Sequence, residues 1–507
     1  MSATIYFDAE PEADFDARCA RSASALRELG VGPGDVVALM LQNEPLLLEL
    51  MLAARCVGAY YCLINWHFKS AEVGHILRDS AAKVLVVHAH LVDTIREGVP
   101  PAVHLFVAAP RERTRIAFDL HGASSRVASG QESWETWRDA RPRPPVAVER
   151  PGSAMLYTSG TTGLAKGIRR QPPSPEQTAA ATQTMRIALG IEQGMRALLS
   201  APIYHAAPSS YAMQAVLNDA HLWIEPRFDA QETLRAIESR RISHAYLVPT
   251  MFRRLLQLPA EVRSAHDLRS LRYIACTGAP CPVETKQRMI EWWGPVIHES
   301  YAASELGYVT HIDSADALRK PGSAGRATPG TRLKVVSGTG EELPPGGVGL
   351  IYARNAGVPD FTYSNNDGAR RQLEHDGLWG LGDMGYLDPE GFLFIVDRKA
   401  NMVISGGVNI YPAEIEAVLV QMEGVADCAV FGVPHEEFGE ALLAVVQPAA
   451  GARLSAEAIQ SYLHERIANF KVPRRIVFQA ELPREETGKI FKRKLREPYW
   501  AGVNRRV

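Results

Sequence analysis

The sequence contains little cysteine, and its cysteines form no recognisable pattern. Six cysteines are scattered over 507 residues, and no two of them make a CxxC pair. This spacing favours neither a structural zinc site nor a disulfide framework, and it fits reduced thiols in a cytosol. We therefore expect a cytoplasmic protein.

The sequence also lacks an excess of charge of one sign. It has 55 Lys and Arg against 57 Asp and Glu, so its formal net charge is −2. Such a chain offers no broad basic field for nucleic acid, and we expect no polyanion partner. Its content of 46% hydrophobic and 22% charged residues is typical of a globular enzyme.

Long apolar runs free of charge are missing as well. The most apolar stretch begins at Pro45 and contains Glu49 and Arg55. It predicts a buried helix followed by a strand, so we expect no stable membrane insertion. The acidic N-terminus lacks the basic start and apolar core of a signal peptide, and we expect no export.

Short β-branched runs alternate with helical patterns through the first part of the chain. Residues 35–41, 82–89 and 242–248 are predicted strands, and residues 230–241 are a predicted helix. This alternation indicates an α/β fold with largely parallel sheets.

Two changes of pattern follow. Residues 326–396 are rich in Gly, Pro and Asp turns between short strands, which predicts an antiparallel, β-rich subdomain. Beyond Asp397, helices and strands alternate as in a small α+β domain. Because 507 residues exceed one hydrophobic core, we expect a large N-terminal domain over 1–399, with parallel-sheet α/β subdomains and the β-rich subdomain, and a small mobile domain over 400–507.

The segment "YTSGTTGLAKG", residues 157–167, has the composition of a phosphate-binding loop. It is not a Walker P-loop, because Ala165 stands where that motif needs its second glycine and Gly167 where it needs a hydroxyl. The two prolines that follow also exclude a helix there. Two interpretations remain at this point: a strand-to-strand loop that wraps an oligophosphate with Lys166 as counter-charge, or a surface turn that binds nothing.

Together with later segments, this loop resembles the adenylate-forming superfamily of acyl-CoA synthetases, nonribosomal-peptide adenylation domains and firefly luciferases. The later segments are "TGAP" (277–280), "ESYAASE" (299–305), "GLWGLGDMGYLDPEGFLFIVDRK" (377–399), "NMVISGGVNIYPAEIE" (401–416) and "LPREETGKIFKRKLR" (482–496). The match runs along almost the whole chain in the right order. The resemblance implies an AMP-forming acid–thiol ligase that uses ATP, Mg²⁺ and coenzyme A.

The resemblance assigns the loop to the β- and γ-phosphates of ATP. One departure is Ala165, where the family usually has proline, and we expect alanine to leave the loop more mobile. The implied phosphate contacts are Thr158, Ser159, Gly160, Thr161, Thr162 and Lys166.

The resemblance also implies the remaining nucleotide contacts of the large domain. Tyr301 would stack on adenine, Ser304 would bond the α-phosphate and Glu305 would hold Mg²⁺. Ala302 replaces a glycine of the family motif beside the substrate pocket. The adenine wall would be formed by Gly278, Ala279 and Pro280.

Further roles are implied near the C-terminal domain. Asp383 would accept hydrogen bonds from the ribose hydroxyls and Arg398 would donate to ribose or phosphate. Ala400 would be the hinge, where the family usually has Asp or Lys. The pantetheine tunnel of coenzyme A would be lined by Ser405, Gly406 and Gly407.

Lys489 is the residue that the resemblance assigns to adenylation. The flanking residues Lys492, Arg493 and Lys494 are predicted to form a solvated basic face. In the implied reaction, a carboxylate attacks the α-phosphorus of ATP and the thiol of coenzyme A then attacks the acyl-adenylate. Since Ala165 and Ala400 depart from the family pattern, an alternative stays open: a homologue impaired in adenylation that mainly converts an acyl-adenylate supplied by a partner enzyme.

The expected acyl pocket is lined by residues with small side chains. This predicts a bulky, long or polycyclic carboxylic acid and argues against acetate. His205 either gates this pocket or is an ordinary packed histidine. The identity of the acid and the oligomeric state, a homodimer included, stay open. The small residues are Ala206, Ala207, Ser209, Ser210, Ala212, Ala279, Ala302 and Ala303.

Overall fold

The computed structural model describes residues 3–122, 125–142, 151–158, 165–405, 408–484 and 490–501. The chain divides into two compact units. The first comprises Met1–Pro321, Gly325–Arg332 and Arg354–Gly377, and the second comprises Gly322–Ala324, Leu333–Ala353 and Leu378–Val507. The predicted domain boundary at residue 400 falls inside the second unit and stays a prediction.

The first unit contains a seven-stranded sheet, counted over the described residues. Its central strands run parallel, whereas β6, β7 and β17 pair antiparallel with one another at one edge. The predicted strands at 35–41 and 82–89 are therefore confirmed. In order across the sheet, the strands are β17 (Phe361–Tyr363), β7 (Lys166–Arg170), β6 (Ala154–Thr158), β3 (Tyr60–Leu63), β2 (Val36–Met40), β4 (Ala82–His88) and β5 (His104–Ala108).

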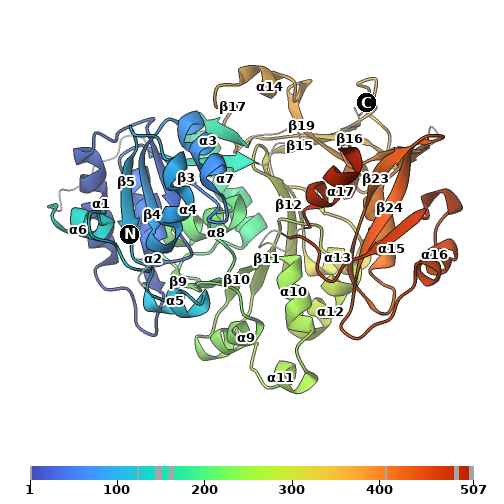
Figure 1. Ribbon diagram of the computed structural model, residues 1–507, viewed down its shortest axis with the longest axis horizontal. Coiled ribbons are helices and arrows are strands. Elements are labelled where there is room, and N and C mark those ends of the chain that lie inside the picture. Colours follow the sequence, from blue (N-terminus) through green and yellow to red (C-terminus); the bar gives the residue numbers. More distant parts are fainter. Residues whose placement is uncertain are drawn as a thin grey trace. The chain divides into compact units, whose positions relative to one another are not determined.

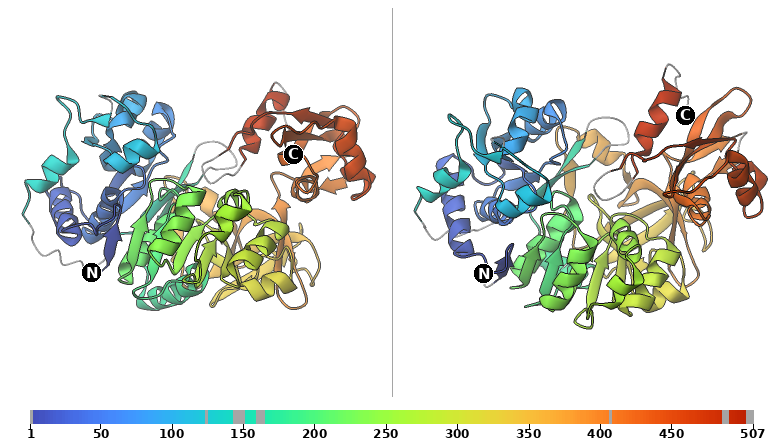
Figure 2. Two further views of the ribbon diagram at one scale, coloured as in Figure 1. Left: turned by 90° about the horizontal axis from the view of Figure 1, so that it is seen from below. Right: turned by 60° about the horizontal axis from the view of Figure 1, so that its bottom comes forward.

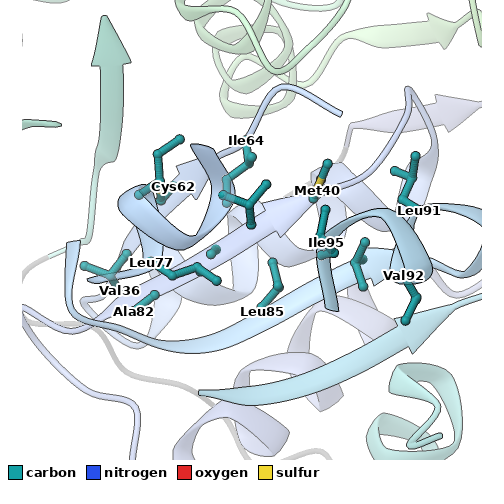
Figure 3. Close-up of a cluster of buried hydrophobic side chains, with 14 of the residues drawn as sticks. Val36, Met40, Cys62, Ile64, Leu77, Ala82, Leu85, Leu91, Val92 and Ile95 are labelled. Carbon is teal, nitrogen blue, oxygen red and sulfur yellow. The ribbon is translucent and has the colours of Figure 1, made fainter. Parts of the chain in front are cut away.

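A compact apolar core packs α3 and α4 against this sheet (Figure 3). Val36 and Met40 of β2 pack with Leu77 of α3 and Ile95 of α4 in this core. The helices of this part of the chain are α1 (Phe15–Glu28), α2 (Pro45–Cys56), α3 (Ser70–Ser80), α4 (Val92–Ile95), α5 (Glu112–Ala117) and α6 (Trp134–Asp139).

Helix α2 is the predicted buried helix. Every residue from Pro45 to Ala54 is buried, and β3 follows at Tyr60, as expected. The buried Glu49 carboxylate accepts hydrogen bonds from Ser22 of α1, at 2.5 Å, and from Arg138 of α6, at 3.0 and 3.1 Å. The charge inside this apolar helix is thus paired.

An eight-stranded sheet, again counted over the described residues, forms the rest of the first unit. It is parallel from β1 to β12 and antiparallel at β13 and β14. Figure 2 shows it mainly in green, next to the blue strands of the first sheet. In order, the strands are β1 (Thr4–Tyr6), β9 (His221–Ile224), β8 (Arg196–Leu199), β10 (His244–Leu247), β11 (Tyr273–Cys276), β12 (Ile297–Ala303), β13 (Gly307–Ile312) and β14 (Arg326–Ala327).

The helices associated with this sheet include the predicted helix at 230–241, which is confirmed as α9. They are α7 (Pro175–Leu189), α8 (Ala206–Leu217), α9 (Ala230–Ser239), α10 (Pro249–Leu256), α11 (Ala260–Ser264), α12 (Val283–Trp293) and α13 (Ser314–Arg319). No helix within the described ranges is both long and apolar enough to cross a bilayer.

Asn43 joins the two sheets of the first unit. Its side-chain nitrogen donates to the carbonyls of Ala201, at 2.9 Å, and Glu225, at 3.1 Å. Its side-chain oxygen accepts from the backbone N–H of Ile203, at 2.8 Å. Because Asn43 follows β2 and its three partners follow β8 and β9, one buried amide ties the edges of both sheets together.

The second unit contains two further sheets. In the first, β16 and β20 each pair antiparallel with β19, as predicted for the Gly- and Asp-rich region. The second sheet, with its helices, has the predicted α+β pattern. The elements are β15 (Thr331–Val336), β16 (Gly349–Asn355), β19 (Leu378–Leu387), β20 (Leu393–Arg398), β21 (Val403–Ser405), β22 (Val408–Ile410), α15 (Pro412–Leu419), β23 (Val425–His435), β24 (Gly439–Pro448), α16 (Ala456–His464), β25 (Arg475–Phe478) and α17 (Lys492–Trp500).

The predicted β-rich region does not form one sheet. Its strand β14 pairs with β13, and its strand β17 pairs with β7, so both belong to sheets of the first unit. The short α14 (Asp367–Arg371) and β18 (Glu374–His375) complete this part of the chain. Figure 1 shows β17 and α14 at the edge of the first unit.

Candidate active site

The candidate phosphate loop lies between two antiparallel strands. The last residue pair of β6 and β7 before the loop is Thr158 with Lys166, so Lys166 begins a strand. The prediction of a strand-to-strand loop is confirmed. Gly167 has no room for a side chain, because a Cβ there would lie 2.7 Å from the ring of Tyr157. Four predicted phosphate contacts, Ser159, Gly160, Thr161 and Thr162, lie outside the described residues.

Glu305 lies beside the base of this loop. Its buried carboxylate accepts a hydrogen bond from Tyr363 of β17, at 2.9 Å, and a longer one from Thr158, at 3.4 Å. The Lys166 ammonium lies 5.3 Å from the centre of the Tyr363 ring. The predicted metal ligand Glu305 and the predicted phosphate contacts Lys166 and Thr158 thus lie around one tyrosine side chain.

Arg170 fixes the turn that carries Glu305. Its guanidinium donates to the backbone carbonyl of Ser304 and, at 3.0 Å, to that of Glu305. Burial lowers the pKa of Arg170 to about 10, which leaves the guanidinium protonated at neutral pH. The position of the two predicted active-site residues Ser304 and Glu305 therefore depends on β7.

The predicted adenine-binding residues lie at the carboxyl ends of neighbouring parallel strands. "TGAP" follows β11, with Gly278 at φ 96°, a conformation that favours glycine. Tyr301 is partly buried near the end of β12. Ligands of α/β sheets commonly bind at this edge. Ala279, Pro280 and Ala302 lie in the same two segments.

A buried ion pair connects these two segments. Glu299 of β12 pairs with Lys286 of α12, and its other oxygen accepts from the backbone N–H of Cys281, at 3.1 Å. Glu299 thereby ties the residue after "TGAP" to the strand that carries Tyr301. Glu299 is the first residue of the motif "ESYAASE", but the sequence alone does not predict that it links these two segments.

His205 directly precedes α8, which carries most of the small residues of the predicted acyl pocket. Its ring lies 4.2 Å from that of Tyr204, centre to centre, in a tilted arrangement. Ser209 and Ala212 of α8 are buried. The pocket role of His205 stays a prediction.

In the second unit, Asp383 and Arg398 are directly opposite each other in β19 and β20. The Nε of Arg398 donates to the Asp383 carboxylate at 3.0 Å. Asp383 is buried and Arg398 is half exposed. Asp383 is thus a strand residue, not a turn residue, and the two predicted ribose contacts form one pair.

Three of the remaining predicted residues lie outside the described ranges: Gly406, Gly407 and Lys489. Ser405 ends β21, where it pairs with Val408 and Gly439. The predicted hinge, Ala400, lies in an exposed turn between β20 and β21, and its carbonyl accepts a bond of 3.4 Å from Arg496. Its function as a hinge stays a prediction.

The prediction of a solvated basic face is wrong for Lys492. Its ammonium forms an ion pair of 2.7 Å with Glu416 of α15, and both side chains are mostly buried. Although burial acts in the opposite direction, the Glu416 carboxylate raises the pKa of Lys492. Arg493 and Lys494 are exposed, as expected.

Sequence reasoning missed two residues of the site, Tyr363 and Arg170. Tyr363 lies on β17, which pairs with β7 although the two segments are almost two hundred residues apart in the chain. Arg170 lies on β7 and reaches the carbonyls of Ser304 and Glu305, more than 130 residues away. Neither residue lies in a motif, and β17 has only three residues. No local signal in the sequence could have found them.

Two family models match the chain. The model of AMP-binding enzymes covers residues 13–359, and the model of the C-terminal domain of AMP-binding enzymes covers residues 414–489. The chain belongs to the AMP-binding enzyme family. The resemblance to adenylate-forming enzymes and the predicted class, an AMP-forming acid–thiol ligase, are therefore confirmed.

Relatives of this AMP-binding enzyme are similar over nearly their whole length. A feruloyl-CoA synthase of an Amycolatopsis species is 32% identical over 96% of this chain and 93% of its own. A long-chain-fatty-acid–CoA ligase of Mycobacterium tuberculosis, FadD13, is 33% identical over 97% of this chain and 93% of its own.

The fold of this AMP-binding enzyme also matches solved structures. The crystal structure of ATP-bound MatB from Rhodopseudomonas palustris is 28% identical and has a TM-score of 0.83 over 98% of this chain and 96% of its own. The predicted α/β fold class, with a large N-terminal and a C-terminal domain, is confirmed.

Proposed function

We propose that this enzyme joins a bulky, long or polycyclic carboxylic acid to coenzyme A through an acyl-adenylate, and that it converts ATP to AMP and pyrophosphate. The observation that carries the proposal is the group formed by Thr158, Lys166, Glu305 and Tyr363 at the base of the β6–β7 loop. In an AMP-binding enzyme, this group combines hydroxyl, ammonium and carboxylate next to a loop rich in Gly, Ser and Thr.

The residues at this group fit a magnesium ion that is bound mainly by phosphate oxygens. Oε1 of Glu305 accepts from Tyr363 and Thr158, which leaves Oε2 without a hydrogen bond from any described residue. One carboxylate with substrate phosphates is a common magnesium environment. When bound, the ion would neutralise charge on the phosphates.

Adenylation requires two anions to approach each other. A carboxylate oxygen of the acid attacks the α-phosphorus, the bond to the bridging oxygen breaks and pyrophosphate leaves. Lys166 and Thr158 would bind the departing pyrophosphate, Ser304 the α-phosphate, and Lys489 the carboxylate. Arg170 would contribute by holding the turn of Ser304 and Glu305.

The proposed nucleoside contacts follow the family motifs. Tyr301 and the segment 278–280 would bind adenine, and Asp383 with Arg398 would bind ribose. The thiol of coenzyme A then attacks the carbonyl carbon of the acyl-adenylate, AMP leaves and the thiol proton passes to solvent. Ser405, Gly406 and Gly407 would line the path of the pantetheine, after rotation about Ala400.

The proposed size of the acid rests on the small residues along α8, after β11 and at the end of β12. A feruloyl-CoA synthase and a long-chain-fatty-acid–CoA ligase among the relatives support an acid larger than acetate. Such acids would be desolvated between apolar walls, which favours binding in proportion to buried area.

The test is a pyrophosphate-release assay with ferulate, palmitate, cholate and acetate, each with and without coenzyme A. Mass spectrometry would identify the acyl-CoA product. We expect release and thioester formation at matching rates with at least one of the three larger acids. Acetate as the best substrate would contradict the proposed substrate class.

The alternative enzyme, which mainly uses a supplied acyl-adenylate, would give a different result in the same assay. It would form thioester rapidly from synthetic acyl-adenylates but release pyrophosphate slowly with every acid. Lys489→Ala provides the reference for that behaviour, because it should abolish adenylation and leave thioester formation intact.

A further inference from the structure

We propose that His75 and Asp79 of α3 are positioning residues for the phosphate loop, and that they act on adenylation without acting on thioester formation. We call these two residues the loop-anchoring pair. The inference rests on the proposed function, because it requires that the β6–β7 loop binds the triphosphate of ATP.

His75 holds the strand on the C-terminal side of the loop. Its Nε2 lies 2.9 Å from the carbonyl oxygen of Ala165, the residue directly before Lys166. A carbonyl can only accept, so Nε2 carries the proton and donates. This bond fixes the backbone at the point from which the Lys166 side chain begins.

Asp79 holds the strand on the N-terminal side of the loop. The hydroxyl of Tyr157, the neighbour of Thr158, donates to the Asp79 carboxylate at 2.7 Å. Burial raises the pKa of Tyr157 well above its usual value, so the hydroxyl keeps the proton that it donates. A second bond to the same carboxylate comes from Asn365, at 3.2 Å.

The two anchoring residues belong to one rigid element. They are four residues apart on α3, so their side chains project from the same face of the helix. Ile76 and Leu77 of α3 are buried in the apolar core, where Figure 3 shows Leu77. The core therefore holds α3 in place, and α3 in turn holds the backbone on both sides of the loop.

Ala165 makes this support more important. Alanine does not fix its φ angle, whereas a proline would stiffen the chain by itself. The hydrogen bond from His75 restricts the same residue from outside. We infer that the enzyme uses a tertiary contact to order the start of β7.

The two half-reactions make the inference testable. The triphosphate is present only during adenylation, since pyrophosphate has left before the thiol attacks. Loss of an anchor should therefore weaken ATP binding and slow pyrophosphate release, but it should not slow thioester formation from a synthetic acyl-adenylate. A general loss of structure would reduce both.

The experiment compares His75→Leu, Tyr157→Phe and His75→Gln with the unaltered enzyme. His75→Leu removes a hydrogen bond to a backbone carbonyl, so we expect kcat/KM for ATP to fall about five- to tenfold. Tyr157→Phe removes a hydrogen bond to a carboxylate, and we expect a fall of about ten- to 100-fold. His75→Gln keeps an N–H donor of similar reach and should recover most of the loss. Measurements are pyrophosphate release, calorimetric binding of magnesium-ATP, and thioester formation from feruloyl-, palmitoyl- and choloyl-adenylate.

His266→Leu is the matched control, because His266 bonds Glu238 at the surface, at 2.8 Å, far from the loop in sequence. Equal losses in both half-reactions, or no loss in adenylation, would overturn the inference while leaving the proposed function in place. No ATP binding and no pyrophosphate release in the unaltered enzyme with any acid would overturn both.

Discussion

The carboxylate of Glu305 is held by neutral hydroxyl donors, and this arrangement decides how substitutions there should behave. Tyr363 supplies the shorter bond and Thr158 the longer one. Both donors orient the carboxylate without cancelling its charge, which preserves it for a cation on the phosphates.

We predict that Glu305→Gln lowers kcat/KM for adenylation by about 100-fold or more, because a neutral amide cannot hold the charge that develops near the phosphates. Tyr363→Phe removes one hydrogen bond that orients the Glu305 carboxylate, and it should lower the same kcat/KM about five- to tenfold. Initial rates of pyrophosphate release measure both variants. Equal losses in the two variants would show that the tyrosine, and not the charge, is the important group.

Asp383 is the second residue whose charge matters. It is buried and paired with Arg398 inside a regular antiparallel register. We predict that Asp383→Ala raises the KM for ATP about ten- to 100-fold, as expected for the loss of hydrogen bonds to an ionised group. Glu414→Ala, which removes a more exposed ion pair with Lys471 in the same unit, serves as the control. An unchanged KM in Asp383→Ala would refute the ribose assignment.

At the scale of elements, α17 begins at a mostly buried ion pair. Lys492 at its first residue pairs with Glu416 of α15, and the same carboxylate accepts from the backbone of Val430 in β23. Helix α17, helix α15 and strand β23 are therefore joined through the Glu416 carboxylate.

We predict that Lys492→Met destabilises the docked α17 by about 1–3 kcal/mol, because the Glu416 carboxylate then loses its counter-charge in a mostly buried place. Amide hydrogen exchange in residues 492–500 should accelerate, whereas exchange in α16 should not. Lys494→Met, at an exposed position, should change neither. Unchanged exchange in α17 of Lys492→Met would show that apolar contacts alone dock the helix.

The sequence predicted elements better than it predicted their contacts. The strands on both sides of the phosphate loop follow from the failed Walker motif and the prolines after it, which exclude a helix. Lys492 shows the limit, because a basic run has the same local pattern whether it faces water or a buried carboxylate. Tyr363 shows the same limit at the active site, since its contact depends on a pairing between distant strands that no local period encodes.

For the molecule as a whole, one buried amide joins the two sheets of the first unit. Asn43 uses both its oxygen and its nitrogen, so its removal would leave the backbone groups of Ala201, Ile203 and Glu225 without a partner on this side. We predict that Asn43→Ala lowers the free energy of unfolding of this unit by about 1–3 kcal/mol. Urea unfolding measures it, and Asn218→Ala, which breaks only a bond within the end of α8, is the control. Equal effects would argue against a role of Asn43 in joining the sheets.

A row of aromatic rings crosses the amino ends of β10, β11 and β12 and the neighbouring carboxyl end of the antiparallel β13. Tyr273 stacks on His298 at 3.8 Å and on His244 at 6.2 Å, and Nδ1 of His298 lies 3.2 Å from Nε2 of His311. Burial lowers the pKa of His244 and of His298 to about 4.

These values predict that acid destabilises the first unit. In the unfolded chain a histidine has a pKa of about 6.5 and binds a proton more readily than in the folded protein. The stability from the neutral rings is therefore complete above about pH 6.5 and is lost as the pH falls towards 4. Unfolding free energies between pH 7 and 4.5 should decline less steeply in His298→Phe than in the unaltered protein. His121→Phe, at an exposed position, is the control, and the same slope in both variants would refute the role of the stack.

The return of β14 and β17 to the first unit has a consequence for biosynthesis. Both strands are encoded after residue 325, yet they complete sheets whose other strands are translated much earlier. A nascent chain on the ribosome therefore cannot finish this unit when its first 321 residues have emerged. Glu305 receives the shorter of its two hydroxyl bonds only after Tyr363 has been translated. Since β17 follows β7 by about 190 residues, translation at about 5–20 residues per second leaves the edge of β7 uncovered for about 10–40 seconds. A chaperone that shields this edge would find its substrate in that interval.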